Sequence, residues 1–225
     1  MPIFDGPAQL YLVRHGETHS NRERRFQGQL DVPLSPAGHE QAVALGRWLA
    51  DRPARFDALY SSDLRRAAQT AETVGAHLGL TPILTPALRE IDCGEWQGLT
   101  GAEIEARFPG GLQTWHDEVD TFCLPGGESV RDLERRIVAF YQDTVTQYRG
   151  DAVVLISHGL SLSVLIAALL GWDLVGAWRE RRAGMANTGV TLLTRDPEQG
   201  GYRLDLLNST EHLPPTADLP ATVTD

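Results

Sequence analysis

Two histidines of this chain each follow a predicted buried strand and precede a glycine. Arg14-His15-Gly16 comes after the apolar residues 10–13, and Ser157-His158-Gly159 comes after the apolar residues 152–156. Arginine grips phosphate oxygens with a planar fork of donors, and glycine lets backbone N–H groups approach an anion closely. A neutral imidazole is a competent nucleophile near neutral pH when a backbone carbonyl holds its other ring nitrogen. The pattern around His15 therefore indicates phosphoryl transfer to a histidine.

A zinc site is disfavoured at the same place. His15 and His19 are four residues apart with Glu17 between them, but the zinc-protease motif needs a glutamate directly after the first histidine and needs a helix. Gly16 takes that position here and the segment follows a strand. The predicted strand ends also carry no aspartate pair placed to hold magnesium. We therefore expect chemistry that needs no metal and no cofactor.

Other phosphatase chemistries need residues that the chain lacks. A cysteine phosphatase has an arginine six positions after its cysteine, where Cys93 has Leu99 and Cys123 has Ser129. All 20 basic residues are arginine, so lysine-dependent Schiff bases and P-loops are excluded. Histidine remains as the nucleophile.

Composition bounds the class of protein. The chain has 225 residues, 42% of them hydrophobic, and a formal net charge of −10. An acidic protein is a poor candidate for nucleic-acid binding and needs local positive charge to attract an anionic substrate. Two cysteines without a CxxC pair indicate a reducing compartment, the cytoplasm. Residues 1–10 lack the pattern of a signal peptide, and the serines and His158 within residues 152–170 argue against a membrane helix.

Strand-like and helix-like segments alternate along the chain. Strands are predicted at residues 10–13, 58–60, 82–85, 152–156, 190–194 and 202–207. Helices are predicted at a segment beginning at Ser35-Pro36, and at residues 63–78 (capped by Ser62 or Asp63), 102–107, 128–148 and 160–170. This alternation predicts an α/β domain with a mostly parallel sheet, whose ligands lie beyond the carboxyl ends of the strands. We expect one domain over residues 1–213 and a disordered Pro- and Thr-rich tail over 214–225.

An ordered series of motifs resembles the histidine phosphatase superfamily, the phosphoglycerate-mutase-like proteins. It spans nearly the whole chain and comprises residues 12–18 (LVRHGET), Asn21, 26–28 (FQG), 31–38 (DVPLSPAG), 61–71 (SSDLRRAAQTA), 88–90 (LRE) with 94–98 (GEWQG), 157–159 (SHG) and 207–213 (LNSTEHL). The resemblance implies a three-layer α/β/α sandwich with a mostly parallel central sheet.

The resemblance also implies residue roles. His15 is the expected nucleophile, and Arg14 and Arg65 are expected to hold phosphate oxygens and keep His15 neutral. His158 is expected to donate to a phosphoryl oxygen. Glu90 is expected to protonate the leaving oxygen and then to deprotonate water, with Asp92 and Glu95 as alternatives. The remaining phosphate-binding candidates are Asn21, Gln27, Gly28 and the backbone of Gly159.

Three functions are compatible with this family. The family's mutases carry basic residues just after the acid/base block, but residues 98–105 contain two acids and no base. Residues 125–129 resemble the phosphatase branch, and all five catalytic candidates are present, which disfavours a non-catalytic phospho-ligand binding module. We therefore predict a metal-independent phosphatase that hydrolyses a small phosphomonoester through a phosphohistidine, with a cofactor-dependent phosphoglycerate mutase as the alternative.

The substrate itself is not readable from the sequence. Its specificity is expected to reside in residues 86–122 and in the loop at residues 22–25. The acidic residues between 103 and 120 favour a substrate with few charges beyond its phosphate. The expected partner is a small phosphorylated metabolite rather than a nucleic acid or a membrane, and the oligomeric state is not predicted.

Overall fold

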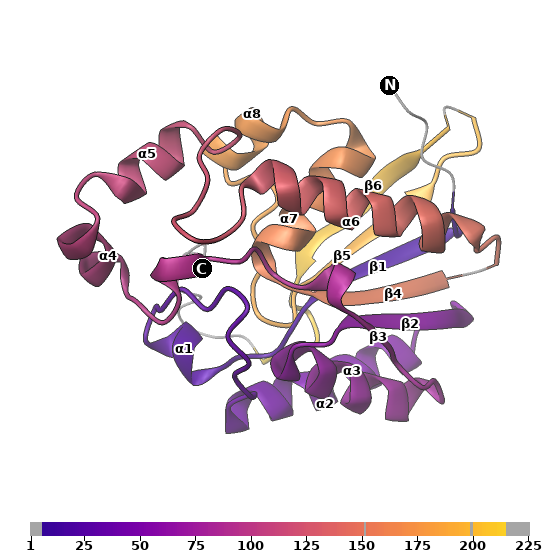
Figure 1. Cartoon of the computed structure of the whole chain (residues 1–225). Coiled ribbons are helices and arrows are strands. Elements are labelled where there is room, and N and C mark those ends of the chain that lie inside the picture. Colours follow the sequence, from indigo (N-terminus) through magenta and orange to yellow (C-terminus); the bar gives the residue numbers. More distant parts are fainter. Residues whose placement is uncertain (1–5, 151, 199, 215–225) are drawn as a thin grey trace.

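A six-stranded sheet forms the centre of the molecule (Figure 1). The computed structural model describes residues 6–150, 152–198 and 200–214. The strands are β1 (Gln9–Arg14), β2 (Phe56–Ser62), β3 (Ile83–Thr85), β4 (Ala152–Ser157), β5 (Val190–Arg195) and β6 (Tyr202–Ser209). Their spatial order is β3-β2-β4-β1-β5-β6. The first four strands of this order are parallel, whereas β5 and β6 are antiparallel to their neighbours.

The α-helices found in the described ranges are α1 (His19–Arg22), α2 (Pro36–Ala50), α3 (Arg65–Leu78), α4 (Gly101–Arg107), α5 (Gly111–Asp117), α6 (Val130–Thr144), α7 (Gly159–Leu170) and α8 (Leu174–Arg179). Short 3-10 helices occupy Pro86–Leu88, Gly94–Trp96 and Val145–Gln147. In Figure 1, α2 and α3 cover one face of the sheet and α6 and α7 cover the other, while α4 and α5 lie to one side. The predicted three-layer α/β/α arrangement is confirmed.

Alternating side chains of the strands feed two cores. Tyr11 and Val13 of β1 pack with the α2–α3 layer, and Leu10 and Leu12 of the same strand pack with the α6–α7 layer. This alternation follows from the two-residue period of a strand. β4 is buried at every position because it lies inside the sheet with helices on both faces. β1 and β4 are adjacent parallel strands, and Arg14 pairs with Ser157. Both histidine motifs therefore begin side by side at the carboxyl ends of these strands.

Helix starts follow local capping chemistry. The side chain of Ser35 accepts from the N–H of Gly38, as predicted, with Pro36 in the first turn. For α3 the predicted cap is wrong: the helix begins at Arg65 after Leu64, which makes no side-chain cap bond. Asp63 is engaged elsewhere, because both its oxygens accept from Arg89 at 2.7 Å. The arginine also lowers the pKa of the Asp63 carboxyl.

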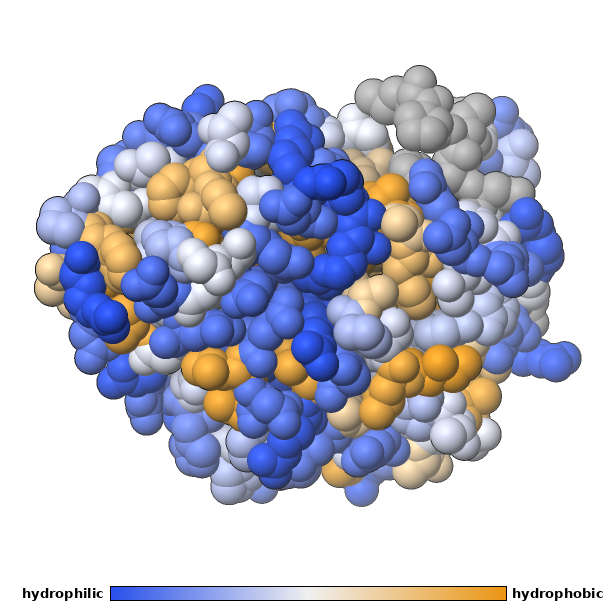
Figure 2. Space-filling model, viewed as in Figure 1, coloured by the Kyte–Doolittle hydropathy of each residue, from blue (hydrophilic) through white to orange (hydrophobic). Residues whose placement is uncertain are grey.

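Other expectations need smaller corrections. The long helix predicted over residues 128–148 is α6 followed by the 3-10 turn Val145–Gln147, and the short helices α1, α5 and α8 were not predicted. Within the described ranges, no helix has the length and apolar character needed to cross a membrane. The face shown in Figure 2 is mostly hydrophilic, with apolar residues in separate small groups. The predicted disordered tail lies, from residue 215 on, outside the described residues.

Candidate active site

His15 is buried directly after β1, with both ring nitrogens engaged. Nδ1 lies 2.7 Å from the carbonyl oxygen of Gly16, so Nδ1 carries the proton and donates it. Nε2 therefore holds a lone pair, which accepts from Nε–H of Arg66 at 3.2 Å. Burial, followed by the charges of Arg66 and Arg14, holds the pKa of His15 well below its ordinary value. The result is a neutral imidazole with a defined tautomer and its nucleophilic nitrogen facing a guanidinium.

The structure places Arg66, and not the predicted Arg65, beside His15. Arg66 is 1% exposed, and its Nη1 and Nη2 donate to the carbonyls of Leu30 and Gly28 at 2.8 and 2.7 Å. Arg65 is exposed, and its backbone N–H donates to Asp31. The reason is the helical period: Arg66 shares the buried stripe of α3 with Thr70, which bonds back to the carbonyl of Arg66 and accepts from Gly16 N–H. The prediction for Arg65 is therefore wrong in its geometry.

Arg14 and His158 complete the buried polar centre. Arg14 donates through Nη1 to the carbonyl of Met185 at 2.8 Å, and a methyl group at Gly159 would lie 3.6 Å from its guanidinium carbon. The His158 ring centroid is 5.1 Å from that of His15. Burial and the charge of Arg66 hold the pKa of His158 well below its ordinary value.

Within the described ranges, neither ring nitrogen of His158 has a hydrogen-bond partner, although both are buried. Buried polar groups are nearly always paired, so an unpaired imidazole beside a nucleophile indicates a group that pairs with a ligand.

Glu90 is the buried acid among the three predicted candidates. Its Oε1 accepts from Ser161 Oγ (2.9 Å), Ser161 N–H (3.1 Å) and Ile91 N–H (2.9 Å), and its Oε2 accepts from Leu160 N–H (3.1 Å). The carboxyl therefore lies at the first turn of α7, two to three residues from His158. Glu95 is exposed and Asp92 instead caps its own turn by accepting from Gly94 N–H.

Thr18 organises the remaining polar candidates. Its hydroxyl lies 3.0 Å from Asn21 Oδ1 and 2.9 Å from Gln27 Oε1, which turns both amide oxygens toward the threonine. The amide nitrogens then point away from it as potential donors. Gly28 contributes differently from expectation. With a φ of 49° it turns its carbonyl to Arg66, so in this structure it anchors the arginine.

Sequence reasoning missed Asn187, whose side chain donates to the carbonyl of His15 at 3.1 Å and to Asn21 Oδ1 at 3.3 Å. No local motif marks this residue. The next residue, Thr188, has a φ of 54° and donates its N–H to the carbonyls of Arg14 and His15. Its hydroxyl contacts His212, whose pKa burial lowers to about 4. The 207–213 motif thus supports the loop that fixes the backbone of His15.

The segments expected to set specificity contain a packed aromatic cluster. Trp96 and Trp115 are buried there, with ring centroids 5.7 Å apart, and Phe26 packs on both. These residues belong to the core and position the loops. At the exposed rim, Arg25 is paired with Glu23 and Glu103. No group of three or more His, Cys, Asp or Glu side chains that could hold a metal ion occurs among the described residues.

Comparison with known proteins identifies the family. Residues 10–210 match the model of the histidine phosphatase superfamily (branch 1). The chain belongs to this superfamily. It is 38% identical over 222 residues to a glucosyl-3-phosphoglycerate phosphatase of Mycolicibacterium vanbaalenii, covering 89% of this chain and 94% of the relative. It is 32% identical over 208 residues to a probable phosphoglycerate mutase of Salmonella choleraesuis, covering 91% and 94%.

Solved structures agree. A mycobacterial glucosyl-3-phosphoglycerate phosphatase in complex with VO3 superposes with a TM-score of 0.78 at 37% identity, covering 90% of this chain and 100% of the other. The predicted superfamily, its fold and its activity, hydrolysis of a phosphate monoester through a phosphohistidine, are confirmed.

Proposed function

We propose that this histidine phosphatase carries the phosphoryl group on Nε2 of His15 and uses Arg14, Arg66, His158 and Glu90 to move it from a small phosphate ester to water. The observation that carries the proposal is the state of His15. It is neutral, its Nδ1 proton is held by the Gly16 carbonyl, and its Nε2 lone pair faces Arg66. Such a nitrogen attacks phosphorus without first losing a proton.

In the first step a bond forms between His15 Nε2 and phosphorus while the ester oxygen–phosphorus bond breaks. The lone pair that now accepts from Arg66 becomes the new bond, which frees that N–H to donate to a phosphoryl oxygen. Arg14 and His158 supply further donors, and their burial strengthens each interaction. Asn21, Gln27 and the Gly159 backbone contribute neutral donors.

Glu90 protonates the departing oxygen in this step. Its Oε2 accepts one hydrogen bond in the described structure, so this oxygen retains a lone pair able to carry the proton, whereas Oε1 accepts three. In the second step water attacks phosphorus, the nitrogen–phosphorus bond breaks, and Glu90 takes the proton from the water. Inorganic phosphate leaves and the neutral imidazole is restored.

The substrate class we propose is a phosphorylated hydroxy acid or its glycoside, with glucosyl-3-phosphoglycerate as the first compound to test. The similarity to phosphatases of that name, at 37–38% identity over nearly the whole chain, supports this choice. Independence of metal ions and a location in the reducing cytoplasm remain predictions from the donor set and the cysteine pattern.

A phosphoglycerate mutase is the second candidate, because a relative with that name is 32% identical. Residues 98–105, which follow the acid/base block, argue against a mutase. Glu103 and Glu105 are both exposed there, and Arg25, the base that reaches this stretch, is held by Glu23 and Glu103. Residues 98–105 therefore lack the basic residues that the family's mutases carry there.

The test is phosphate release from a panel of phosphomonoesters in the presence of EDTA, beside an assay for interconversion of phosphoglycerates. Rapid release from glucosyl-3-phosphoglycerate or another hydroxy-acid phosphate supports the proposal. Rapid release only from esters without a carboxylate rejects the substrate class and keeps the phosphatase. Interconversion without release would establish the mutase instead.

A further inference from the structure

The segment that carries Glu90 lies outside the strands, so no sheet ladder supplies hydrogen bonds to its backbone. Residues 86–92 leave the sheet after β3, form one 3-10 turn and contact the last residue of β4 through Leu88. The last carbonyls of such a turn have no partner within it and must be satisfied from elsewhere. Ser157 Oγ donates to the carbonyl of Leu88 at 2.7 Å. Ser161 Oγ lies 2.9 Å from the carbonyl of Arg89 and 2.9 Å from Glu90 Oε1, and its one hydrogen is shared between these two acceptors.

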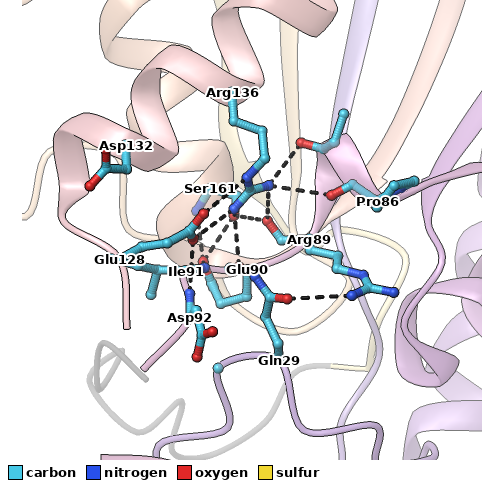
Figure 3. A network of polar contacts seen from close by, with 12 residues as sticks. Gln29, Pro86, Arg89, Glu90, Ile91, Asp92, Glu128, Asp132, Arg136 and Ser161 are labelled. Atoms are coloured by element: carbon cyan, nitrogen blue, oxygen red, sulfur yellow. Dashed lines mark hydrogen bonds and ion pairs between the residues drawn. The ribbon is translucent and has the colours of Figure 1, made fainter. Parts of the chain in front are cut away.

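The guanidinium of Arg136, a residue of α6, donates to further carbonyls of this segment (Figure 3). Its Nη1 donates to the carbonyls of Ala87 and Arg89 at 3.0 and 2.9 Å, and its Nη2 lies 3.3 Å from the carbonyl of Glu90 itself. Nη1 also lies 3.5 Å from the carbonyl of Pro86, so this planar guanidinium with five donors faces four carbonyls of the segment.

Glu128 fixes the guanidinium from the opposite side. It accepts from Arg136 Nη2 at 3.0 Å and Nε at 3.3 Å, and it also accepts from the backbone N–H of Asp92 at 2.9 Å. The backbone N–H of Glu128 in turn donates to the Asp92 carbonyl at 2.9 Å. Arg136 and Glu128 thus clamp the backbone before and after Glu90, and Figure 3 shows the Glu90 side chain between the two clamped stretches.

We infer that Arg136, oriented by Glu128, is a positioning residue. It holds the backbone on both sides of Glu90 so that the Glu90 carboxyl stays in the position required for proton transfer to the leaving oxygen. This inference rests on the proposed function, because it takes Glu90 as the general acid. Arg136 is not placed against the phosphate: its donors are occupied by the carbonyls and by Glu128. Its charge contributes to the lowered pKa of His158, after burial and the charges of Arg66, His15 and Arg14. Its loss should therefore act mainly on proton transfer and leave the contacts of the phosphate-binding residues in place.

The expected size follows from geometry. A displacement of a catalytic group by about 1 Å costs on the order of 100-fold in rate. With Ser161 still holding the carboxyl, we expect Arg136→Gln to lower kcat/KM for an alkyl phosphate such as glycerol phosphate by about 10- to 100-fold.

The measurement that separates positioning from general stability is the dependence on the leaving group. 4-Nitrophenolate departs without protonation, so kcat/KM for 4-nitrophenyl phosphate should change by no more than about twofold in Arg136→Gln. Arg135→Gln is the matched control, because it makes the same change one residue earlier on α6, where the side chain is 77% exposed. It should leave both esters unaffected.

A second comparison tests the route through Glu90. In a Glu90→Gln background, adding Arg136→Gln should cause no further loss with the alkyl ester. Arg136→Lys keeps the charge but not the fork, so it should fall between wild type and Arg136→Gln. If Arg136→Gln does not fold, Arg136→Lys and Glu128→Gln are measured in its place, with the same expected selectivity for the alkyl ester.

Equal losses for both esters, no loss for either, or a further loss in the double variant would overturn the inference. Failure of the underlying function would look different: Glu90→Gln itself would then not discriminate between the two esters.

Discussion

Replacement of Arg66 or Arg65 by alanine offers a matched pair on adjacent residues of one helix. Nε of Arg66 lies 3.2 Å from His15 Nε2. Once the phosphoryl group is attached to Nε2, the guanidinium can donate to a phosphoryl oxygen instead. Loss of one preorganised donor of this kind costs about 100- to 1,000-fold in rate, or about 3–4 kcal/mol. We expect that loss in kcat/KM for Arg66→Ala, and a change within about twofold for Arg65→Ala.

Stability must be measured beside activity, because Arg66 also supports the fold. Its removal leaves the carbonyls of Gly28 and Leu30 without this donor, at about 1–3 kcal/mol for each carbonyl that stays buried and unpaired. Thermal unfolding and active-site titration of each variant correct kcat/KM for the folded fraction. A larger corrected loss in Arg65→Ala, or activity of Arg66→Ala within about tenfold of wild type, would refute the assignment of Arg66 to the phosphoryl group.

The remaining predictions concern ionisation, metals and the backbone of the nucleophile. Imidazole 15N spectra should show His15 and His158 neutral at pH 6, and a charged ring at that pH would contradict the assignment. Since the unfolded chain protonates these rings below about pH 6.5 and the folded chain does not, the free energy of unfolding should fall as the pH drops below that value; a melting temperature that rises on acidification would oppose this. EDTA should leave phosphate release unchanged, and restoration of a lost activity by zinc or magnesium would reject metal independence. Asn187→Ala should lower kcat about tenfold, as expected when a catalytic group loses a supporting hydrogen bond, with less than twofold change in KM; an unchanged kcat would remove Asn187 from the site.

The sheet and its two histidine motifs could be predicted because they depend on local patterns. β4 is apolar from residue 152 to residue 156, and the alternation of such runs with helices defines the α/β class. The cap at Ser35 could be predicted because serine is a preferred N-cap residue and proline is favoured at the first position of a helix. These features are encoded within a few residues of each other.

The exchange of Arg65 for Arg66 has an instructive cause. Both arginines fit the motif equally well by residue type, and the choice depends on which one lies on the buried stripe of α3. Arg66 precedes Thr70 and Val74 by four and eight residues, whereas Arg65 precedes the partly exposed Gln69 by four. The helical period, applied within the motif, would have selected Arg66.

Long-range contacts explain the other omissions. Asn187 reaches His15 across 172 residues of chain, and Arg136 reaches Glu90 across 46. The cap of α3 was misassigned because Asp63 pairs with Arg89, 26 residues away. A single sequence contains no local signal for such pairs, since each depends on how separate elements pack.

During turnover the phosphoryl group should reside on His15, and rapid-quench labelling measures this directly. The enzyme is mixed with 32P-labelled substrate, quenched in alkali within milliseconds, digested, and the labelled peptide is sequenced. We expect a base-stable, acid-labile phosphohistidine at His15, increased in Glu90→Gln with 4-nitrophenyl phosphate as substrate, and absent from His15→Ala together with its activity. Label on His158, or full activity in His15→Ala, would contradict the central claim.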